Sequence, residues 1–299
     1  MKALFNQCFF YFCKMELSYL SEQALEKFIN DALNEDVGDG DHSSLAAIPM
    51  ESRSKAKLLI KGDGILAGVE LSKKIFNHFD KDIKLDLKLH DGVEVSFGDV
   101  GFTVEGSARS ILTCERLVLN CMQRMSGIAT YTRQLTELIK GTGAQLLDTR
   151  KTTPNFRLME KWAVAIGGGT NHRFGLYDMI MLKDNHIDFA GGISKAITAT
   201  KNYLTETGRS LKIEIETRNL QEVEEVVKTG GVDIIMLDNM IPSVMKDALK
   251  IIDGKYKTEA SGGITENNIR EVAECGVDFI SVGALTHSVR SMDISLKAY

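Results

Sequence analysis

The stretch LKIEIETRNLQEVEEVVKTGGVDIIMLDN, residues 211–239, decides the fold of this chain. Its two ends, 211–217 and 232–238, are short runs rich in Ile, Val and Leu that predict strands. The segment between them, 220–230, has apolar residues at helical spacing and closes on glycine, which predicts an amphipathic helix. A strand–helix–strand unit of this kind is typical of neighbouring parallel strands joined by a crossover helix.

The same alternation continues on both sides of that unit. Apolar runs at 144–150, 178–184, 257–263 and 279–284 predict further strands, and 266–276 predicts another helix that ends at glycine. Repeated units of this kind predict a parallel sheet, and the absence of a dinucleotide fingerprint favours a barrel. Because only six strands are recognisable, we expect an α/β fold with an incomplete parallel barrel.

One glycine-rich segment superficially resembles a dinucleotide-binding loop. GDGILAG, residues 62–68, lacks the G-x-G-x-x-G spacing, and we predict a turn that no helix follows. No nicotinamide cofactor is therefore expected.

The first third of the chain has a different pattern. Residues 24–33 predict a helix, and 55–60, 83–89 and 100–104 predict strands separated by turns that contain Gly and Asp. A long helical stretch then begins at Glu115 and leads into the repeated strand–helix units.

These patterns predict an N-terminal domain over 1–114 and a catalytic barrel domain over 115–286, with 287–299 packing back on the first domain. The opening residues 1–14, MKALFNQCFFYFCK, are apolar and aromatic but lack the small-residue cleavage site of a signal peptide. Met15 opens a segment that is typical of a natural protein start. We therefore expect residues 1–14 to be an extension that stems from a start codon assigned too early.

Composition disfavours several broad classes of function. The net charge of −5 at pH 7 gives no global basic surface for nucleic acid, so an anionic ligand needs a local cluster of cations. No apolar run reaches the ~18–20 residues that a membrane span requires. The five cysteines are odd in number and lack zinc-binding spacing, which favours a reducing compartment. We expect a cytoplasmic protein with no membrane or nucleic-acid partner.

Charged residues and glycines follow the predicted strands at their carboxyl ends, where α/β barrels carry their active sites. Each one alone could be a solvated strand end, but six otherwise apolar strands all end this way. Within the strand at 211–217, alternation with two isoleucines points Lys212, Glu214 and Glu216 to the barrel interior. The residues at the strand ends are Arg150, Lys151, Lys183, Asp184, Glu216, Asp238, Asn239, Ser261, Gly262, Gly263, Gly283 and Ala284.

The cations form one set, to which the segment GGGTNHR at 167–173 contributes two members. Arginine offers a planar fork suited to carboxylate and phosphate, so cations that converge in an acidic protein predict a ligand with several negative charges. A single histidine in such a segment could equally be structural. The set consists of Arg150, Lys151, His172, Arg173 and Lys183.

Two carboxylates, Glu216 and Asp238, oppose these cations at neighbouring strand ends. They suit either a magnesium ion shared with phosphates or stabilisation of a developing positive charge. The glycines after the last two predicted strands favour a phosphate held on backbone N–H groups, although tight turns would also explain them. The residues together predict a polyanionic substrate, a phosphate-bearing partner and Mg²⁺.

Several segments that carry these residues closely resemble the quinolinate phosphoribosyltransferase family. TRKTTP and NHR-x-GLYD-x-x-x-x-KDNH are highly specific to it, whereas SGGI alone would be weak. The resemblance runs from about Met15 to the C-terminus. The segments are LLDTRKTTP at 146–154, GGGTNHRFGLYDMIMLKDNHI at 167–187, EIE at 214–216, MLDN at 236–239, SGGI at 261–264 and VGALTHS at 282–288.

The resemblance implies an N-terminal α/β sandwich domain, an incomplete α/β barrel, and a homodimer whose active sites are shared between subunits. It implies transfer of a phosphoribosyl group from phosphoribosyl pyrophosphate to quinolinate with decarboxylation, with Mg²⁺ and without PLP or thiamine. Arg116 would reach the site of the neighbouring subunit, and Lys183, Glu216 and Asp238 are the expected catalytic residues. The quinolinate carboxylates would be held by Arg116, Arg150, His172, Arg173 and Lys183. The phosphoribosyl pyrophosphate would contact Lys151, Glu216, Asp238, Ser261 and Gly283.

Three other functions remain open from the residues. A related phosphoribosyltransferase could act on another acid such as nicotinate, or belong to the molybdenum-locus type, although five cations argue for a dicarboxylate. A Schiff-base aldolase could use Lys183 or Lys151 on the same barrel. A non-enzymatic anion-binding module is the third alternative, and the acid pair argues against it.

Overall fold

The computed structural model describes residues 17–299, so the predicted extension over 1–14 lies outside the described residues. The chain divides into two compact units. The first consists of residues up to Arg133 together with Thr152–Gly168 and Val289–Tyr299, and the second consists of Gln134–Lys151 and Gly169–Ser288. The division at Arg133 falls inside helix α5 (Ala108–Leu138) and therefore differs from the predicted boundary at 115.

The first unit is built on an antiparallel sheet with strand order β12-β1-β5-β3. The C-terminal segment forms β12, and Leu58 of β1 pairs with Leu296 of β12. A second, two-stranded sheet pairs β2 with β4. The strands are β1 (Arg53–Ile60), β2 (Gly64–Ile65), β3 (Lys84–Leu87), β4 (Glu94–Val95), β5 (Val100–Ser107) and β12 (Ile294–Ala298).

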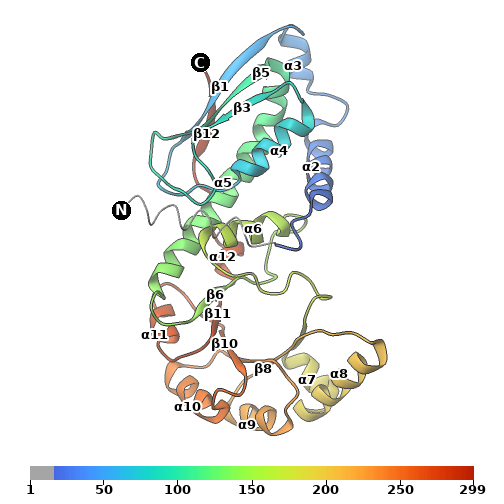
Figure 1. Ribbon diagram of the computed structural model, residues 1–299, viewed down its shortest axis with the longest axis vertical. Helices are drawn as coiled ribbons and strands as arrows, with labels where there is room; N and C mark the ends of the chain where they lie inside the picture. The colour runs from blue at the N-terminus through green and yellow to red at the C-terminus, as the bar shows by residue number, and fades with distance from the viewer. Residues whose placement is uncertain (1–16) are drawn as a thin grey trace. The chain divides into compact units, whose positions relative to one another are not determined.

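Helices cover this antiparallel sheet, and Figure 1 shows α4 and the first half of α5 alongside it. The ring of Phe76 on α4 meets that of Phe102 on β5 edge to face, with centroids 6.3 Å apart, and both side chains are fully buried. The helices of this unit, besides α5, are α2 (Glu22–Val37), α3 (His42–Ala47), α4 (Val69–Phe79) and α6 (Arg157–Gly167).

The prediction that no helix follows GDGILAG is wrong, because α4 begins at Val69, directly after it. The backbone N–H groups of Val69 and Glu70 are capped by the carboxylate of Asp91, at 2.8 and 3.3 Å. Helix starts are predicted from a capping residue directly before the helix. Asp91 lies far from Val69 in the sequence, so no such local signal is present.

The second unit contains a parallel sheet with strand order β6-β11-β10-β9-β8-β7. Each edge strand, β6 and β7, pairs with only one other named strand of the described chain, so the predicted incomplete barrel is confirmed. The strands are β6 (Gln145–Leu147), β7 (Ile180–Leu182), β8 (Ile213–Thr217), β9 (Ile234–Asp238), β10 (Lys257–Ser261) and β11 (Phe279–Ser281).

Helices follow these strands in the chain, and Figure 1 shows α7 to α11 in an arc around the parallel strands. Several have recognisable start signals: Asn219 caps α9 by accepting the N–H of Glu222 at 3.0 Å, and Pro242 opens α10. The helices are α7 (Asp184–Ala190), α8 (Ile193–Thr207), α9 (Leu220–Thr229), α10 (Pro242–Ile252), α11 (Ile269–Ala273) and α12 (Ala284–His287).

Strand β8 shows how the alternation positions charge inside the sheet. Ile213 and Ile215 are buried on one face, and Glu214 and Glu216 are buried on the other. Lys212 is exposed because the strand begins one residue later, so its predicted interior position is wrong.

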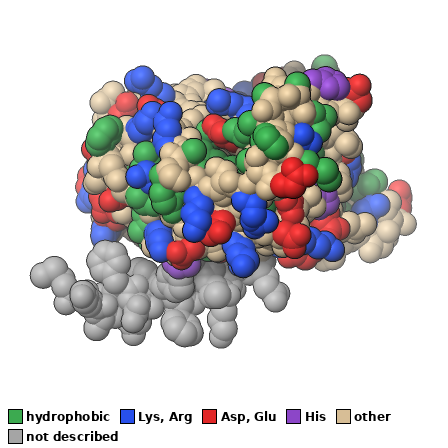
Figure 2. Space-filling model, turned by 90° about the horizontal axis from the view of Figure 1, so that it is seen from above, with side chains coloured by type: hydrophobic (Ala, Val, Ile, Leu, Met, Phe, Trp, Pro, Cys, Tyr) green, Lys and Arg blue, Asp and Glu red, His purple; other side chains and the backbone are tan. Residues whose placement is uncertain are grey.

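Within residues 17–299, no helix combines the length and the apolar character needed to cross a bilayer. On the face of the molecule shown in Figure 2, side chains of both charge signs are interspersed.

Candidate active site

The inner face of the parallel sheet is defined by the pairing of its strands. Across β8, β9 and β10, Glu216 lies beside Met236 and Met236 beside Glu259, while Asp238 lies beside Ser261. Side chains of residues paired across parallel strands point to the same face, so this register places acidic and hydroxyl groups together at the carboxyl ends of the strands.

Glu216 and Asp238 form the predicted acid pair, and Lys183 lies beside them. The Lys183 Nζ atom is 3.7 Å from Glu216 Oε2. Burial raises the pKa of Glu216, and the neighbouring negative charge of Asp238 raises it further. A cation between two such carboxylates would relieve their repulsion, so these residues fit a hard divalent ion such as Mg²⁺.

The turn after β10 is held against Asn239. The Asn239 backbone N–H donates to the Ser261 carbonyl at 2.8 Å, and its amide Nδ2 donates to Asp238 Oδ2 at 2.6 Å. Gly262 has φ +89°, and a Cβ there would lie 2.2 Å from Asn239 Oδ1, so this glycine is required by packing. Gly263 also has positive φ, and a Cβ on it would meet no atom within 4 Å, which leaves its backbone approachable.

A second close approach occurs where β11 leads into α12. A Cβ on Gly283 would lie 3.1 Å from Lys151 Cδ and 3.1 Å from His287 Nε2. The Thr286 hydroxyl donates to the Lys151 carbonyl at 2.7 Å. Lys151, predicted from the end of another strand, is therefore brought to the start of α12, beside Gly283 and Ala284.

Arg150 and Arg173 form a pair of like charges. The guanidinium of Arg173 donates to the Met179 carbonyl at 3.1 Å and lies 3.6 Å from the Met181 sulfur. Burial lowers the pKa of Arg173, and the positive charge of Arg150 lowers it further. An anionic group between these two forks would offset their repulsion, which suits a ligand carboxylate.

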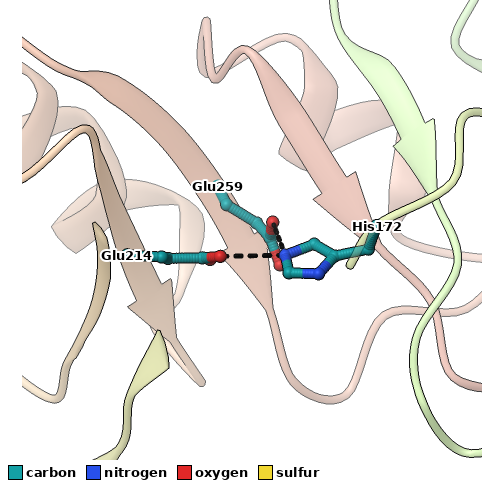
Figure 3. A group of neighbouring side chains, drawn as sticks. All are labelled: His172, Glu214 and Glu259. Carbon is teal, nitrogen blue, oxygen red and sulfur yellow. Dashed lines mark hydrogen bonds and ion pairs between the residues drawn. The ribbon is translucent and has the colours of Figure 1, made fainter. Parts of the chain in front are cut away.

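His172 points toward two buried acids, Glu214 and Glu259, as Figure 3 shows. Its Nε2 lies 2.8 Å from Glu214 Oε2 and 3.3 Å from Glu259 Oε2, and both glutamates are fully buried. Its Nδ1 accepts the backbone N–H of Arg173 at 2.8 Å. Both ring nitrogens therefore have protein partners.

The two buried acids affect the pKa of His172. Burial alone would lower the pKa of His172, but its interactions with Glu214 and Glu259 outweigh that effect and raise the pKa to about 9. Burial raises the pKa of Glu214 to about 7. Because the backbone N–H of Arg173 donates to Nδ1, that nitrogen favours the form with a free lone pair. Whether the imidazole is neutral or charged, Nε2 carries a proton that faces the carboxylates.

Sequence reasoning missed two residues that hold this segment, Asp148 and Glu259. The buried carboxylate of Asp148 accepts the backbone N–H of His172 at 2.8 Å and the amide of Asn171 at 2.6 Å. Asp148 stands within the quoted segment at 146–154, and Glu259 lies two residues before Ser261 on the same face of β10. Period-two alternation from Ser261 would have found Glu259.

Arg116 is the predicted site residue that stands apart. It is an exposed residue of α5 in the first unit, whereas all the other predicted site residues belong to the second unit. If Arg116 were a simple surface residue, it could pair with Glu115. No such ion pair is present among the salt bridges of residues 17–299.

Comparison with known proteins identifies the family. Residues 41–126 and 128–297 match the N-terminal and C-terminal domains of quinolinate phosphoribosyl transferase. The chain is 45% identical over 288 residues to quinolinate phosphoribosyltransferase (decarboxylating) 1b of Nicotiana tabacum, which covers 91% of this chain and 82% of that protein. It is 46% identical over 288 residues to the chloroplastic nicotinate-nucleotide pyrophosphorylase (carboxylating) of Oryza sativa subsp. japonica, with 91% and 77% covered.

Among solved structures, the crystal structure of NadC from Streptococcus pyogenes superposes with a TM-score of 0.87 at 40% identity, and covers 93% of this chain and 97% of that one. The two domain matches and these full-length similarities agree with the fold and with the segments quoted above. The chain belongs to the quinolinate phosphoribosyltransferase family.

Proposed function

We propose that this protein transfers the phosphoribosyl group of phosphoribosyl pyrophosphate to quinolinate and releases carbon dioxide and pyrophosphate. The product is nicotinate mononucleotide, which places the enzyme in NAD biosynthesis. The observation that carries the proposal is the meeting of an acid pair, Glu216 and Asp238, with cations at one edge of the parallel sheet. The names of the similar proteins support it and favour it over the aldolase alternative.

The quinolinate side of the site is assigned to the cations. Arg150 and Arg173 repel each other, so a substrate carboxylate between them would be bound by two planar forks. Lys183 would hold the second carboxylate, and Arg116 completes the proposed set. His172, predicted to bind a carboxylate directly, has protein partners at both ring nitrogens and is proposed instead to support Arg173. A dicarboxylate satisfies this number of positive charges better than a monocarboxylate does.

The phosphoribosyl pyrophosphate side is assigned to the acids, the glycine turns and one lysine. Gly263 presents an approachable backbone, and Lys151 lies beside the start of α12. A magnesium ion bound with the pyrophosphate would neutralise its charge and is proposed to be held near Glu216 and Asp238. The residues proposed to contact this substrate are Lys151, Glu216, Asp238, Ser261, Gly262, Gly263, Gly283 and Ala284.

The chemistry follows from this division of charge. As the bond between C1′ and pyrophosphate breaks, the ribosyl carbon gains positive charge, and Glu216 and Asp238 stabilise it. The pyridine nitrogen of quinolinate then donates its electron pair to C1′. The cationic ring accepts the electron pair of the breaking C2–carboxylate bond, so carbon dioxide leaves without PLP or thiamine, and a proton replaces it at C2. Lys183 stays charged and holds the carboxylate region, so the protein mainly supplies position and charge.

We further propose a homodimer with shared active sites and a cytoplasmic location. The exposed Arg116, in a different unit from the other site residues, supports the shared site. The rice relative is chloroplastic, so its location differs from the one proposed here.

A direct assay tests the function. The purified protein is mixed with quinolinate, phosphoribosyl pyrophosphate and Mg²⁺, and nicotinate mononucleotide is followed together with released carbon dioxide. One carbon dioxide per nucleotide is the expected result. Failure to form nucleotide under conditions where the folded protein binds quinolinate would exclude the proposed reaction.

Substitutions in the acid pair should affect turnover more than quinolinate binding. For Glu216→Ala or Asp238→Ala we expect kcat to fall about 10²-fold, because both residues act on the ribosyl charge and the magnesium-bound phosphates. The KM for quinolinate should change little. Steady-state kinetics with each substrate varied in turn measures both effects, and a variant with normal turnover and only a raised quinolinate KM would contradict the assigned role.

A further inference from the structure

We propose that Glu214 and Glu259 are positioning residues that hold His172, and through it the backbone of Arg173, in the geometry that binds quinolinate. The inference rests on the proposed function, and it gives a role to a buried acid pair distinct from the pair at the rim. Glu214 lies on β8 and Glu259 on β10, the two strands that flank β9.

The burial of these two acids needs an explanation. Both side chains are fully buried, and within the described chain Glu214 Oε1 and both carboxylate oxygens of Glu259 accept no hydrogen bond. Uncompensated buried carboxylates are costly, and β9 presents only apolar neighbours to them, Ile234 beside Glu214 and Met236 beside Glu259. His172 is the partner that approaches both acids, at 2.8 and 3.3 Å, as Figure 3 shows.

Contacts of His172 connect the two buried acids to the proposed substrate-binding residue Arg173. The ring of His172 is held at Nε2 by a hydrogen bond to Glu214 and an ion pair with Glu259, and its Nδ1 accepts the backbone N–H of Arg173. Residues 171–179 have no helix or strand of their own, so these bonds and those to Asp148 replace a regular hydrogen-bond ladder. The guanidinium of Arg173 then donates to the Met179 carbonyl at 3.1 Å.

Loss of one acid should therefore weaken quinolinate binding and spare the ribosyl chemistry. Glu259→Gln keeps the shape and an acceptor oxygen but removes the charge that orients Nε2–H. We expect the Kd of quinolinate, measured by calorimetry in the absence of phosphoribosyl pyrophosphate, to rise about 10-fold. The KM for phosphoribosyl pyrophosphate should stay within about twofold and kcat within about threefold.

A matched control and a second variant keep the test decisive. Glu224→Gln, at an exposed position of α9, makes the same chemical change and should leave all constants unchanged. Glu214→Gln should reproduce the effect of Glu259→Gln. If thermal unfolding shows that Glu259→Gln does not fold, Glu214→Gln provides the test. A quinolinate Kd within twofold of wild type in a folded variant overturns the proposal.

A double-mutant cycle separates positioning from a general structural role. If Glu259 acts through His172, then Glu259→Gln should have no further effect on the quinolinate Kd in a His172→Gln background. Additive effects would show that Glu259 acts independently of His172 and would overturn the inference. If wild-type protein itself neither binds nor converts quinolinate, the proposed function fails, which is a different outcome from an active wild type with insensitive variants.

Discussion

Nicotinate in place of quinolinate is expected to lower kcat/KM by at least about 10³-fold, because a site built around a charged group leaves its partners unpaired when that group is missing. Nicotinate lacks the carboxylate at C2, so Lys183, which is proposed to hold that group, would be left without its substrate partner. The measurement is kcat/KM for each acid at saturating phosphoribosyl pyrophosphate and Mg²⁺, with nucleotide product quantified. No carbon dioxide should accompany any slow reaction of nicotinate.

Comparable efficiency with the two acids would contradict the quinolinate assignment and favour a related phosphoribosyltransferase of different specificity. The KM for phosphoribosyl pyrophosphate serves as the internal control, since it should be similar with either acid.

Mixing two inactive variants should restore activity if the active sites are shared. Arg116→Ala and Arg150→Ala are each expected to lose at least about 10²-fold in kcat/KM, because each leaves a substrate carboxylate without its partner. In a mixed dimer, one site receives intact Arg116 from one subunit and intact Arg150 from the other. Random pairing makes about half the dimers mixed, each with one intact site, so activity should approach about a quarter of wild type.

A second mixture provides the control for subunit exchange. Arg150→Ala and Glu216→Ala both change residues of the second unit, so a mixed dimer contains no intact site and should stay inactive. If tagged subunits demonstrably exchange and the mixture of Arg116→Ala with Arg150→Ala remains at the level of the single variants, Arg116 does not act across a subunit boundary.

Alternating strands and helices were sufficient to predict the fold of the second unit, because each strand of a parallel sheet is a local apolar run followed by a local helix. The runs at 144–150 and 178–184 were predicted longer than β6 and β7 are. In both segments the strand pairing ends before Arg150 and Lys183, which lie at the site. The predicted runs therefore extend beyond the paired residues at both ends.

The parts that sequence did not predict depend on distant partners. Helix α4 is capped by Asp91 from outside its own segment, and no spacing rule connects the two. The side chain of His172 meets Glu214 and Glu259 only because β8 and β10 lie on either side of β9 in the sheet. Lys212 was misplaced because alternation gives the face of a residue but not the first residue of the strand.

The pairing of β12 with β1 has a consequence for biosynthesis. During translation, β1 emerges long before β12, so one edge of the first sheet stays open until β12 has been made. Such long-range closure slows folding, and an open strand edge is a template for association with other chains. Deletion of β12 should therefore yield aggregated protein rather than a folded enzyme with reduced activity.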